Sequence, residues 1–155
     1  MNEVLRLYPV VPFNIRLALK DTTLPHGGGA DGNQPMAILK DNPVGYSTLV
    51  MQRRPDLYPP PSSSFPPVDQ FVPERWEHWI PKSWQYIPFN GGPRICIGQQ
   101  FALTEMAYTI VKILQRYDRI ECMMNEHPGL KTEIVLAPVK GVKVAFYAAV
   151  GSEKA

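Results

Sequence analysis

The chain has 155 residues, 45% of them apolar, and a formal charge of only +2, with basic and acidic residues interspersed. This length suits one domain, and the balanced charge lacks the basic patch that nucleic-acid binding requires. No apolar run approaches the roughly 20 residues that cross a bilayer, and two cysteines are too few for a disulfide framework.

The first third of the chain predicts one helix followed by short strands. Residues 1–8 suit a helix that ends before Pro9 and Pro12, and no N-cap residue precedes it. Such a start is typical of a truncated chain. Strands are expected over 15–19, 36–39 and 46–51, with turns at the glycine clusters 27–29 and 31–33.

Proline is overrepresented, with 17 residues where average usage predicts about eight. The Pro/Ser-rich segment, residues 59–70, contains the run PPPSSSFPP and is expected to be an exposed loop. Two other interpretations stay open. The first is that the segment is a retained intron read as protein. The second is that it is a proline-rich ligand for the aromatic groove of another domain.

The second half begins with residues 71–98, which are expected to form an irregular meander followed by a loop that contains Cys96. The apolar spacing over 99–117 then predicts a helix whose wide apolar face suggests burial. Residues 134–147 suit two strands joined as a hairpin, and 148–155 form a tail. These elements predict an α+β fold, mainly α with small β-sheets.

The most informative segment is the cysteine loop, FNGGPRICIG over residues 89–98, which directly precedes the long helix. Its glycines let the backbone turn tightly and approach a flat ligand closely. Cys96 is expected beside the amides of a helix N-terminus, a place that favours a metal-binding thiolate. Phe89 can shield the sulfur from water, and Arg94 supplies a cation for an acidic ligand. The alternative is a buried, inert cysteine in a glycine-rich turn.

The cysteine loop resembles the haem-ligand motif of the cytochrome P-450 family, F-x-x-G-x-R-x-C-x-G, at every fixed position. The resemblance implies the C-terminal portion of that fold, incomplete here, spanning residues 1–147. It implies haem b as cofactor, with the Cys96 thiolate as axial iron ligand. It also implies that two arginines face the haem propionates. The residues expected to bind the cofactor are Cys96, Arg94, Phe89, Gly92, Gly98 and Arg16.

Within the family, the sequences of residues 2–9, 21–25 and 88–105 most resemble those of fungal fatty-acid and alkane hydroxylases. This resemblance implies a monooxygenase that hydroxylates a small apolar substrate, with Val11 and Phe13 facing it. NADPH would supply electrons through a reductase on the proximal face. Full-length relatives sit on the endoplasmic reticulum membrane through an N-terminal anchor, and the chain without it would be cytoplasmic.

Two further motifs support the resemblance. Glu3 and Arg6 stand three residues apart on the expected helix, so their side chains can meet, and they resemble the family's E-x-x-R element. Arg75, in the run FVPERW, resembles the arginine of the family's P-E-R-F/W segment. The family implies a buried charge network of these three residues, with a structural role rather than a catalytic one.

The sequence also departs from the family pattern. It contains no A-G-x-[DE]-T-[TS] element, which in the family delivers protons during oxygen activation. Gln52 takes the place of a frequent histidine in an H-R pair. The alternative function is therefore a truncated, non-catalytic remnant that at most binds haem.

Overall fold

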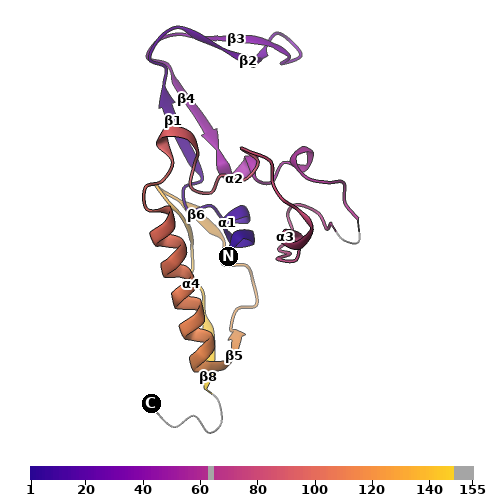
Figure 1. The fold of residues 1–155 in the computed structure, drawn as a ribbon, viewed down its shortest axis with the longest axis vertical. Coiled ribbons are helices and arrows are strands. Elements are labelled where there is room, and N and C mark those ends of the chain that lie inside the picture. Colours follow the sequence, from indigo (N-terminus) through magenta and orange to yellow (C-terminus); the bar gives the residue numbers. More distant parts are fainter. Residues whose placement is uncertain (63–64, 149–155) are drawn as a thin grey trace.

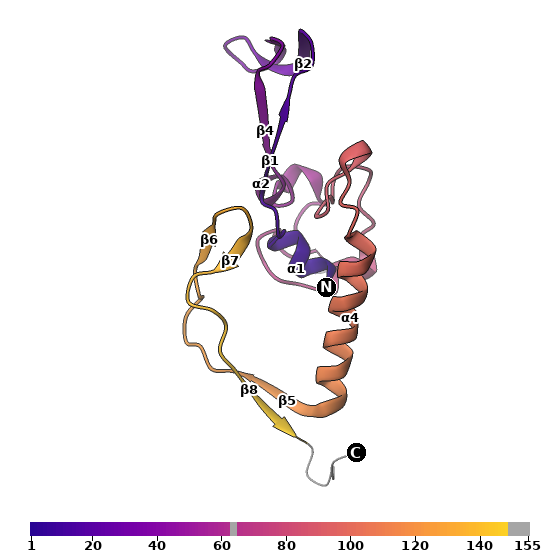
Figure 2. The same cartoon turned by 90° about the vertical axis from the view of Figure 1, so that its left-hand side faces the viewer.

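Figure 1 shows the computed structural model of the chain, which describes residues 1–62 and 65–148. The helix α1 lies near the centre, a β-hairpin arm reaches one end, and the long helix α4 runs toward the other (Figures 1 and 2). The elements are α1 (Asn2–Leu7), β1 (Phe13–Leu17), β2 (Thr22–Gly28), β3 (Gln34–Ile38), β4 (Pro43–Ser47), α2 (Thr48–Met51), α3 (Arg75–His78), α4 (Gln99–Arg116), β5 (Tyr117–Cys122), β6 (Leu130–Thr132), β7 (Leu136–Pro138) and β8 (Val144–Ala148).

The predicted combination of helices with small β-sheets is confirmed. In the described part of the chain the strands form four two-stranded antiparallel sheets, β1–β4, β2–β3, β5–β8 and β6–β7. The β2–β3 hairpin is inserted between β1 and β4 and extends beyond them (Figure 2). The helix α1 ends at Leu7 because Pro9 has no amide hydrogen with which to continue it.

The strand expected over 46–51 is wrong in its second half. The strand β4 ends at Ser47, and residues Thr48–Met51 form α2 instead. The cause is a helix cap, because the Ser47 hydroxyl oxygen accepts a hydrogen bond from the Val50 amide over 3.2 Å. Capping therefore overrides the β-propensity of this apolar run.

The hairpin expected over 134–147 is also wrong. The strand β7 pairs with β6 through a tight turn. The strand β8 pairs with β5, in continuous register from Cys122–Val144 to Arg119–Tyr147, and the register shifts before the last pair, Tyr117–Ala148. The reason is that β8 and β7 each have another pairing partner, β5 and β6, which the sequence did not reveal as strands. The tail expected over 148–155 lies outside the described residues, apart from Ala148 at the end of β8.

The core lies beside α1 and α3 and includes the aromatic side chains of Tyr58, Phe65 and Trp79. The Trp79 ring is tilted against Tyr58 at 4.6 Å between centroids and meets Phe65 edge-on at 6.4 Å. The Pro/Ser-rich segment is therefore not an exposed loop throughout. Residues 59–62 are exposed, but Phe65 is only 5% exposed because it completes the aromatic core.

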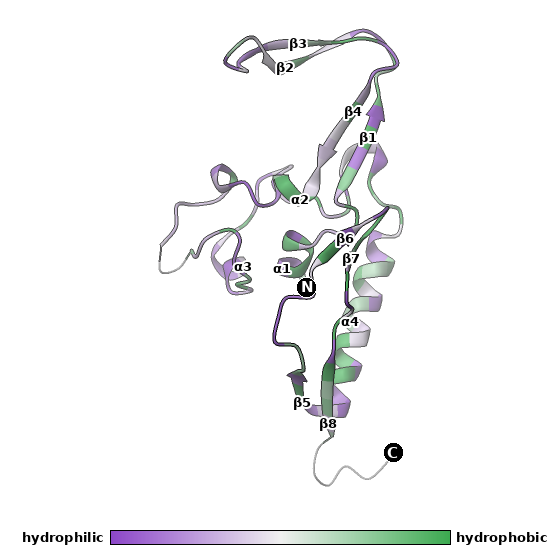
Figure 3. Ribbon diagram, turned by 180° about the vertical axis from the view of Figure 1, so that it is seen from behind, coloured by the Kyte–Doolittle hydropathy of each residue, from purple (hydrophilic) through white to green (hydrophobic). Residues whose placement is uncertain are grey.

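The helix expected over 99–117 is α4, Gln99–Arg116, but its apolar face is not buried by the described residues. Phe101 and Leu114 are 74% and 63% exposed, and hydrophobic stretches run along the helix in Figure 3. An open groove of about 420 Å³ lies between α1 and α4, with Leu5 and Met106 among its lining residues. The burial that the wide apolar face suggested is therefore not seen among the described residues.

Candidate functional site

The cysteine loop is closed on itself by backbone hydrogen bonds at the start of α4. The Cys96 amide donates to the Phe89 carbonyl oxygen over 2.9 Å, and the Ile95 amide donates to the Gly92 carbonyl oxygen over 3.1 Å. Gly92 has a φ of 68°, in the left-handed region where glycine is unstrained. The loop thus has a defined backbone path around the cysteine.

The thiol of Cys96 is free and exposed at the N-terminus of an 18-residue helix. Gly98 is the N-cap of that helix, and a Cβ placed on it would lie 3.9 Å from the Cys96 Sγ. Ile97 and Arg94 are exposed on either side, and Phe89 is half-buried. A single accessible sulfur with apolar flanks and one cation suits a flat, apolar metal complex that carries acidic groups. The residues present therefore fit a haem.

The β1–β4 sheet brings a second arginine toward the cysteine loop. Asn14 and Arg16 alternate with exposed residues on β1, so they share one face of the sheet. On that face the Arg16 guanidinium lies 5.7 Å from the centroid of the Tyr46 ring. The Tyr46 hydroxyl in turn donates to the Asn90 Oδ1 in the cysteine loop over 2.7 Å. Arg16 therefore stands on the side of the sheet that meets the loop.

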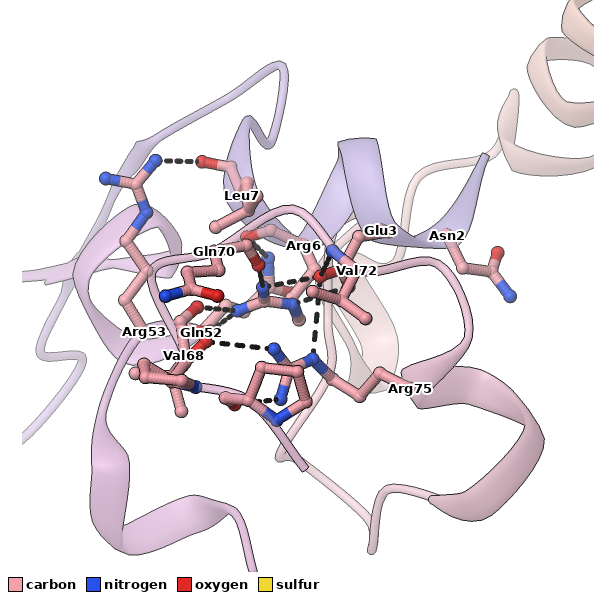
Figure 4. A network of polar contacts seen from close by, with 12 residues as sticks. Asn2, Glu3, Arg6, Leu7, Gln52, Arg53, Val68, Gln70, Val72 and Arg75 are labelled. Carbon is pink, nitrogen blue, oxygen red and sulfur yellow. Dashed lines mark hydrogen bonds and ion pairs between the residues drawn. The ribbon is translucent and has the colours of Figure 1, made fainter. Parts of the chain in front are cut away.

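The structure brings Glu3, Arg6 and Arg75 together in one buried cluster (Figure 4). Arg6 binds the Glu3 carboxylate in a fork, donating from Nε and Nη2 over 2.8 Å each, and Arg75 Nε approaches Glu3 Oε1 to 3.5 Å. The Val72 amide and Trp76 Nε1 also donate to Glu3, each over 3.0 Å. Both guanidinium groups are 0% exposed.

Further donors of the two arginines are satisfied by backbone oxygens of the Pro/Ser-rich segment itself. Arg75 donates to the carbonyl oxygens of Pro66 and Pro67 over 3.0 Å each. Arg6 donates to the Val68 carbonyl oxygen over 2.6 Å. The Pro/Ser-rich segment, which the sequence predicted to be solvent-exposed, thus accepts hydrogen bonds from both buried arginines.

The charge network shifts the ionisation of its own members. Burial raises the pKa of Glu3, but hydrogen bonds from Arg6 and the Val72 amide outweigh burial and hold this pKa below its usual value. Burial lowers the pKa of Arg6, but the Glu3 carboxylate outweighs it and raises that pKa. Burial also raises the pKa of Tyr86 strongly, with Glu3 adding to the effect. The cluster therefore keeps Glu3 and Arg6 charged.

Sequence reasoning missed the part that Gln52 plays. Its side-chain Nε2 donates to the carbonyl oxygens of Leu5 and Arg6 over 3.1 and 3.0 Å, and its Oε1 accepts from the Ile87 amide over 2.9 Å. Its own carbonyl oxygen accepts from Arg6 Nη1 over 3.3 Å and from the Tyr58 hydroxyl. The sequence showed only that Gln52 replaces a frequent histidine of the family, and it gave no indication of which residues Gln52 would contact.

The expected substrate-facing residues lie just before β1 and at its first position. Val11 and Phe13 are both exposed. The Leu136 amide of β7 donates to the Val10 carbonyl oxygen over 2.8 Å, so β7 runs beside this segment. The strand β7 therefore neighbours the expected substrate-facing residues, although the two stretches are far apart in sequence.

The comparisons with known proteins decide the family. A family model described as Cytochrome P450 matches residues 1–146. The chain belongs to the cytochrome P450 family. It is 52% identical over 151 residues to cytochrome P450 monooxygenase pvhE of Talaromyces variabilis, covering 95% of this chain and 28% of that protein. It is 50% identical over 135 residues to cytochrome P450 52E1 of Candida apicola, covering 85% of this chain and 24% of that protein.

A solved structure agrees with the family. Retinoic acid-bound cyanobacterial CYP120A1 superimposes with a TM-score of 0.72 at 25% identity, over 96% of this chain and 31% of that protein. The chain thus spans about a quarter to a third of the length of these P450s. Proteins of this family carry haem, whose iron is bound by a cysteine thiolate. Within the described residues, no helix is both long and apolar enough to cross a membrane.

Proposed function

We propose that this chain supplies the thiolate-bearing part of a haem monooxygenase that hydroxylates a small apolar substrate such as a fatty acid or an alkane. The observation that carries the proposal is the exposed Cys96 thiol, which lies in a closed loop at the start of α4. When bound, a haem with a thiolate ligand supplies the iron at which dioxygen is activated.

The chain's own residues hold and orient the cofactor. Cys96 would hold the iron through its thiolate, and Gly98, the N-cap of α4, would lie against the haem next to this sulfur. Arg94 and Arg16 pair with the haem propionates, because guanidinium groups bind carboxylates through two parallel hydrogen bonds. Phe89, the half-buried first residue of the loop, would limit the access of water to the sulfur. The proposal assigns Glu3, Arg6 and Arg75 to structure alone.

The substrate and the electron source follow from the same proposal. Val11 and Phe13 contribute apolar contacts to the substrate, which suits an alkyl chain rather than a charged molecule. Electrons come from NADPH through a reductase that docks on the proximal face. The protein works at the endoplasmic reticulum membrane, as its resemblance to the hydroxylase group implies.

The test compares the two free cysteines, both of which are exposed. The full chain is loaded with haem b, reduced and exposed to CO, and its Soret spectrum is recorded for the wild type, Cys96→Ala and Cys122→Ala. We expect the red-shifted, thiolate-type band from the wild type and Cys122→Ala, and its loss in Cys96→Ala. A thiolate-type band that survives in Cys96→Ala would contradict the assignment.

A second candidate is a chain that holds haem without catalysing hydroxylation. The uncovered apolar face of α4 favours it, because catalysis needs a site from which water is excluded. The two candidates differ in one assay, the oxidation of dodecanoic acid by the haem-loaded chain with NADPH and a P450 reductase. Hydroxylated product supports the monooxygenase, whereas NADPH consumption without product supports the non-catalytic binder.

A further inference from the structure

Asn90 occupies a position of the cysteine loop that the family motif leaves open, yet both ends of its side chain are hydrogen-bonded. Its Oδ1 accepts from the Tyr46 hydroxyl over 2.7 Å, and its Nδ2 donates to the Asn14 Oδ1 over 2.9 Å. The backbone of Asn90 has a φ of 64°, in the left-handed region that most residues other than glycine avoid and that asparagine tolerates better than most. Two hydrogen bonds to the β1–β4 sheet therefore add to the stability of this backbone conformation.

The two partners of Asn90 form a rigid platform. Asn14 on β1 and Tyr46 on β4 are directly opposite each other in the antiparallel register, so their side chains lie on the same face of the sheet. At the next residue, a Cβ on Gly91 would come within 2.7 Å of the Trp84 Cζ3. The start of the loop is thus in contact both with the sheet and with an indole ring.

The contact is one residue away from the hydrogen bond that closes the loop. Asn90 follows Phe89, whose carbonyl oxygen accepts from the Cys96 amide over 2.9 Å. A shift in the position of Asn90 is therefore transmitted to Cys96 through the adjacent residue Phe89 and this hydrogen bond. The same sheet face carries Arg16, with its guanidinium over the Tyr46 ring.

We propose that Asn90, with Asn14 and Tyr46, is a positioning device that fixes the Cys96 thiolate relative to the β1–β4 sheet. In its cofactor-dependent part the inference rests on the proposed function. With the device intact, the sulfur and the Arg16 side chain keep one relative position, so iron and propionate are bound together. Without it, the loop opens and the thiolate is lost as a ligand more readily.

Three variants test the device, and a fourth is a matched control. Tyr46→Phe removes one hydrogen bond but keeps the ring, and Asn90→Gly removes both while tolerating the positive φ. Asn90→Asp is the conservative variant, because the Asn14 Nδ2, buried and without a hydrogen-bond partner among the described residues, can turn to donate to it. The control Tyr147→Phe removes a comparable hydroxyl bond, 2.9 Å to Glu121, on the distant β5–β8 sheet.

The first readout needs no cofactor. Amide hydrogen exchange is measured on the haem-free chain for a peptide that contains Phe89–Cys96. We expect exchange about three- to tenfold faster in Tyr46→Phe and Asn90→Gly, since each lost hydrogen bond favours opening by that order. Asn90→Asp and Tyr147→Phe should exchange at the wild-type rate. Equal exchange in all variants overturns the inference.

The second readout is the share of the ferrous CO complex that shows the thiolate-type band after haem loading. A lower share in Tyr46→Phe and Asn90→Gly, restored in Asn90→Asp, supports positioning of the sulfur, because a general loss of stability would not be rescued selectively. A wild-type share in both variants overturns it. If Cys96→Ala alone abolishes the band, the proposed function stands without this device. If the wild type lacks the band, the proposed function fails and the exchange experiment still decides the device.

Discussion

Replacing Glu3 with glutamine tests whether the buried charge network stabilises the fold. Glu3 is 2% exposed and accepts hydrogen bonds from Arg6, Arg75, Trp76 and the Val72 amide. Glutamine has nearly the same shape but no charge, and one of its two terminal atoms donates instead of accepting. The variant therefore changes the chemistry of the centre of the network with little change of volume.

The cost follows from the contacts. Oε1 accepts from Arg6, Val72 and Arg75, and Oε2 accepts from Arg6 and Trp76, so a glutamine amide nitrogen faces at least two donors in either orientation. Two guanidinium groups that are 0% exposed also lose their counter-charge. Removing one partner from a buried ion pair costs about 3–5 kcal/mol. A loss of that size is a large fraction of the stability of about 5–15 kcal/mol that is typical of a domain.

The assay is urea unfolding followed by tryptophan fluorescence, since Trp76 and Trp79 lie in or beside the network. The control is Asp56→Asn, which removes the charge from an exposed pair with Arg54 at 2.6 Å. Exposed pairs contribute little, so the control should leave the unfolding midpoint nearly unchanged. If Glu3→Gln shifts the midpoint no more than Asp56→Asn, the network does not stabilise the fold and the reasoning is refuted.

Two further outcomes follow from the same region. The pKa of Glu3 is lower in the folded state than its usual value near 4.5, so its contribution is complete above that pH and is lost as the pH falls through the folded pKa. Urea unfolding at decreasing pH should show this loss in the wild type, and Glu3→Gln should show a shallower decline. Phe65→Ala should destabilise the chain by about 3–5 kcal/mol because Phe65 is buried in the aromatic core, whereas Phe71→Ala, at an exposed site, should change the unfolding midpoint little. Equal midpoints for the two phenylalanine variants would mean that the Pro/Ser-rich segment does not belong to the core.

The parts of the site that could be predicted from sequence are those with local patterns. Cys96 is recognisable because glycines, an arginine and a following helix stand at fixed offsets within ten residues. Glu3 and Arg6 share a helical turn, so their meeting needs no knowledge of the rest of the fold. Arg75, 72 positions from Glu3, could be assigned only from the family resemblance, and the structure then places it at 3.5 Å from the same carboxylate.

The parts that could not be predicted depend on contacts between distant segments. Phe65 stands in a run of serine and proline whose composition predicts an exposed loop. Its ring nevertheless packs beside Trp79 and Arg75. The pairing of β8 with β5 rather than β7 depends on the chain returning to the end of α4, which the turn residues at 138–141 do not reveal. Asn90 and Tyr46 are 44 residues apart, and neither stands at a position that the family motif fixes.

Gln52 shows how the charge network and the cysteine loop are mechanically connected. Its amide donates to two carbonyl oxygens of α1 and accepts from the Ile87 amide, and the Ile87 carbonyl oxygen accepts in turn from the Asn90 amide over 3.0 Å. A neutral histidine has one donor and one acceptor, so it could not make all three of these side-chain bonds, whereas glutamine can. The glutamine that departs from the family pattern therefore fits its surroundings fully. It ties the buried helix to the same residue that the β1–β4 sheet holds, so the start of the cysteine loop is anchored from two independent parts of the fold.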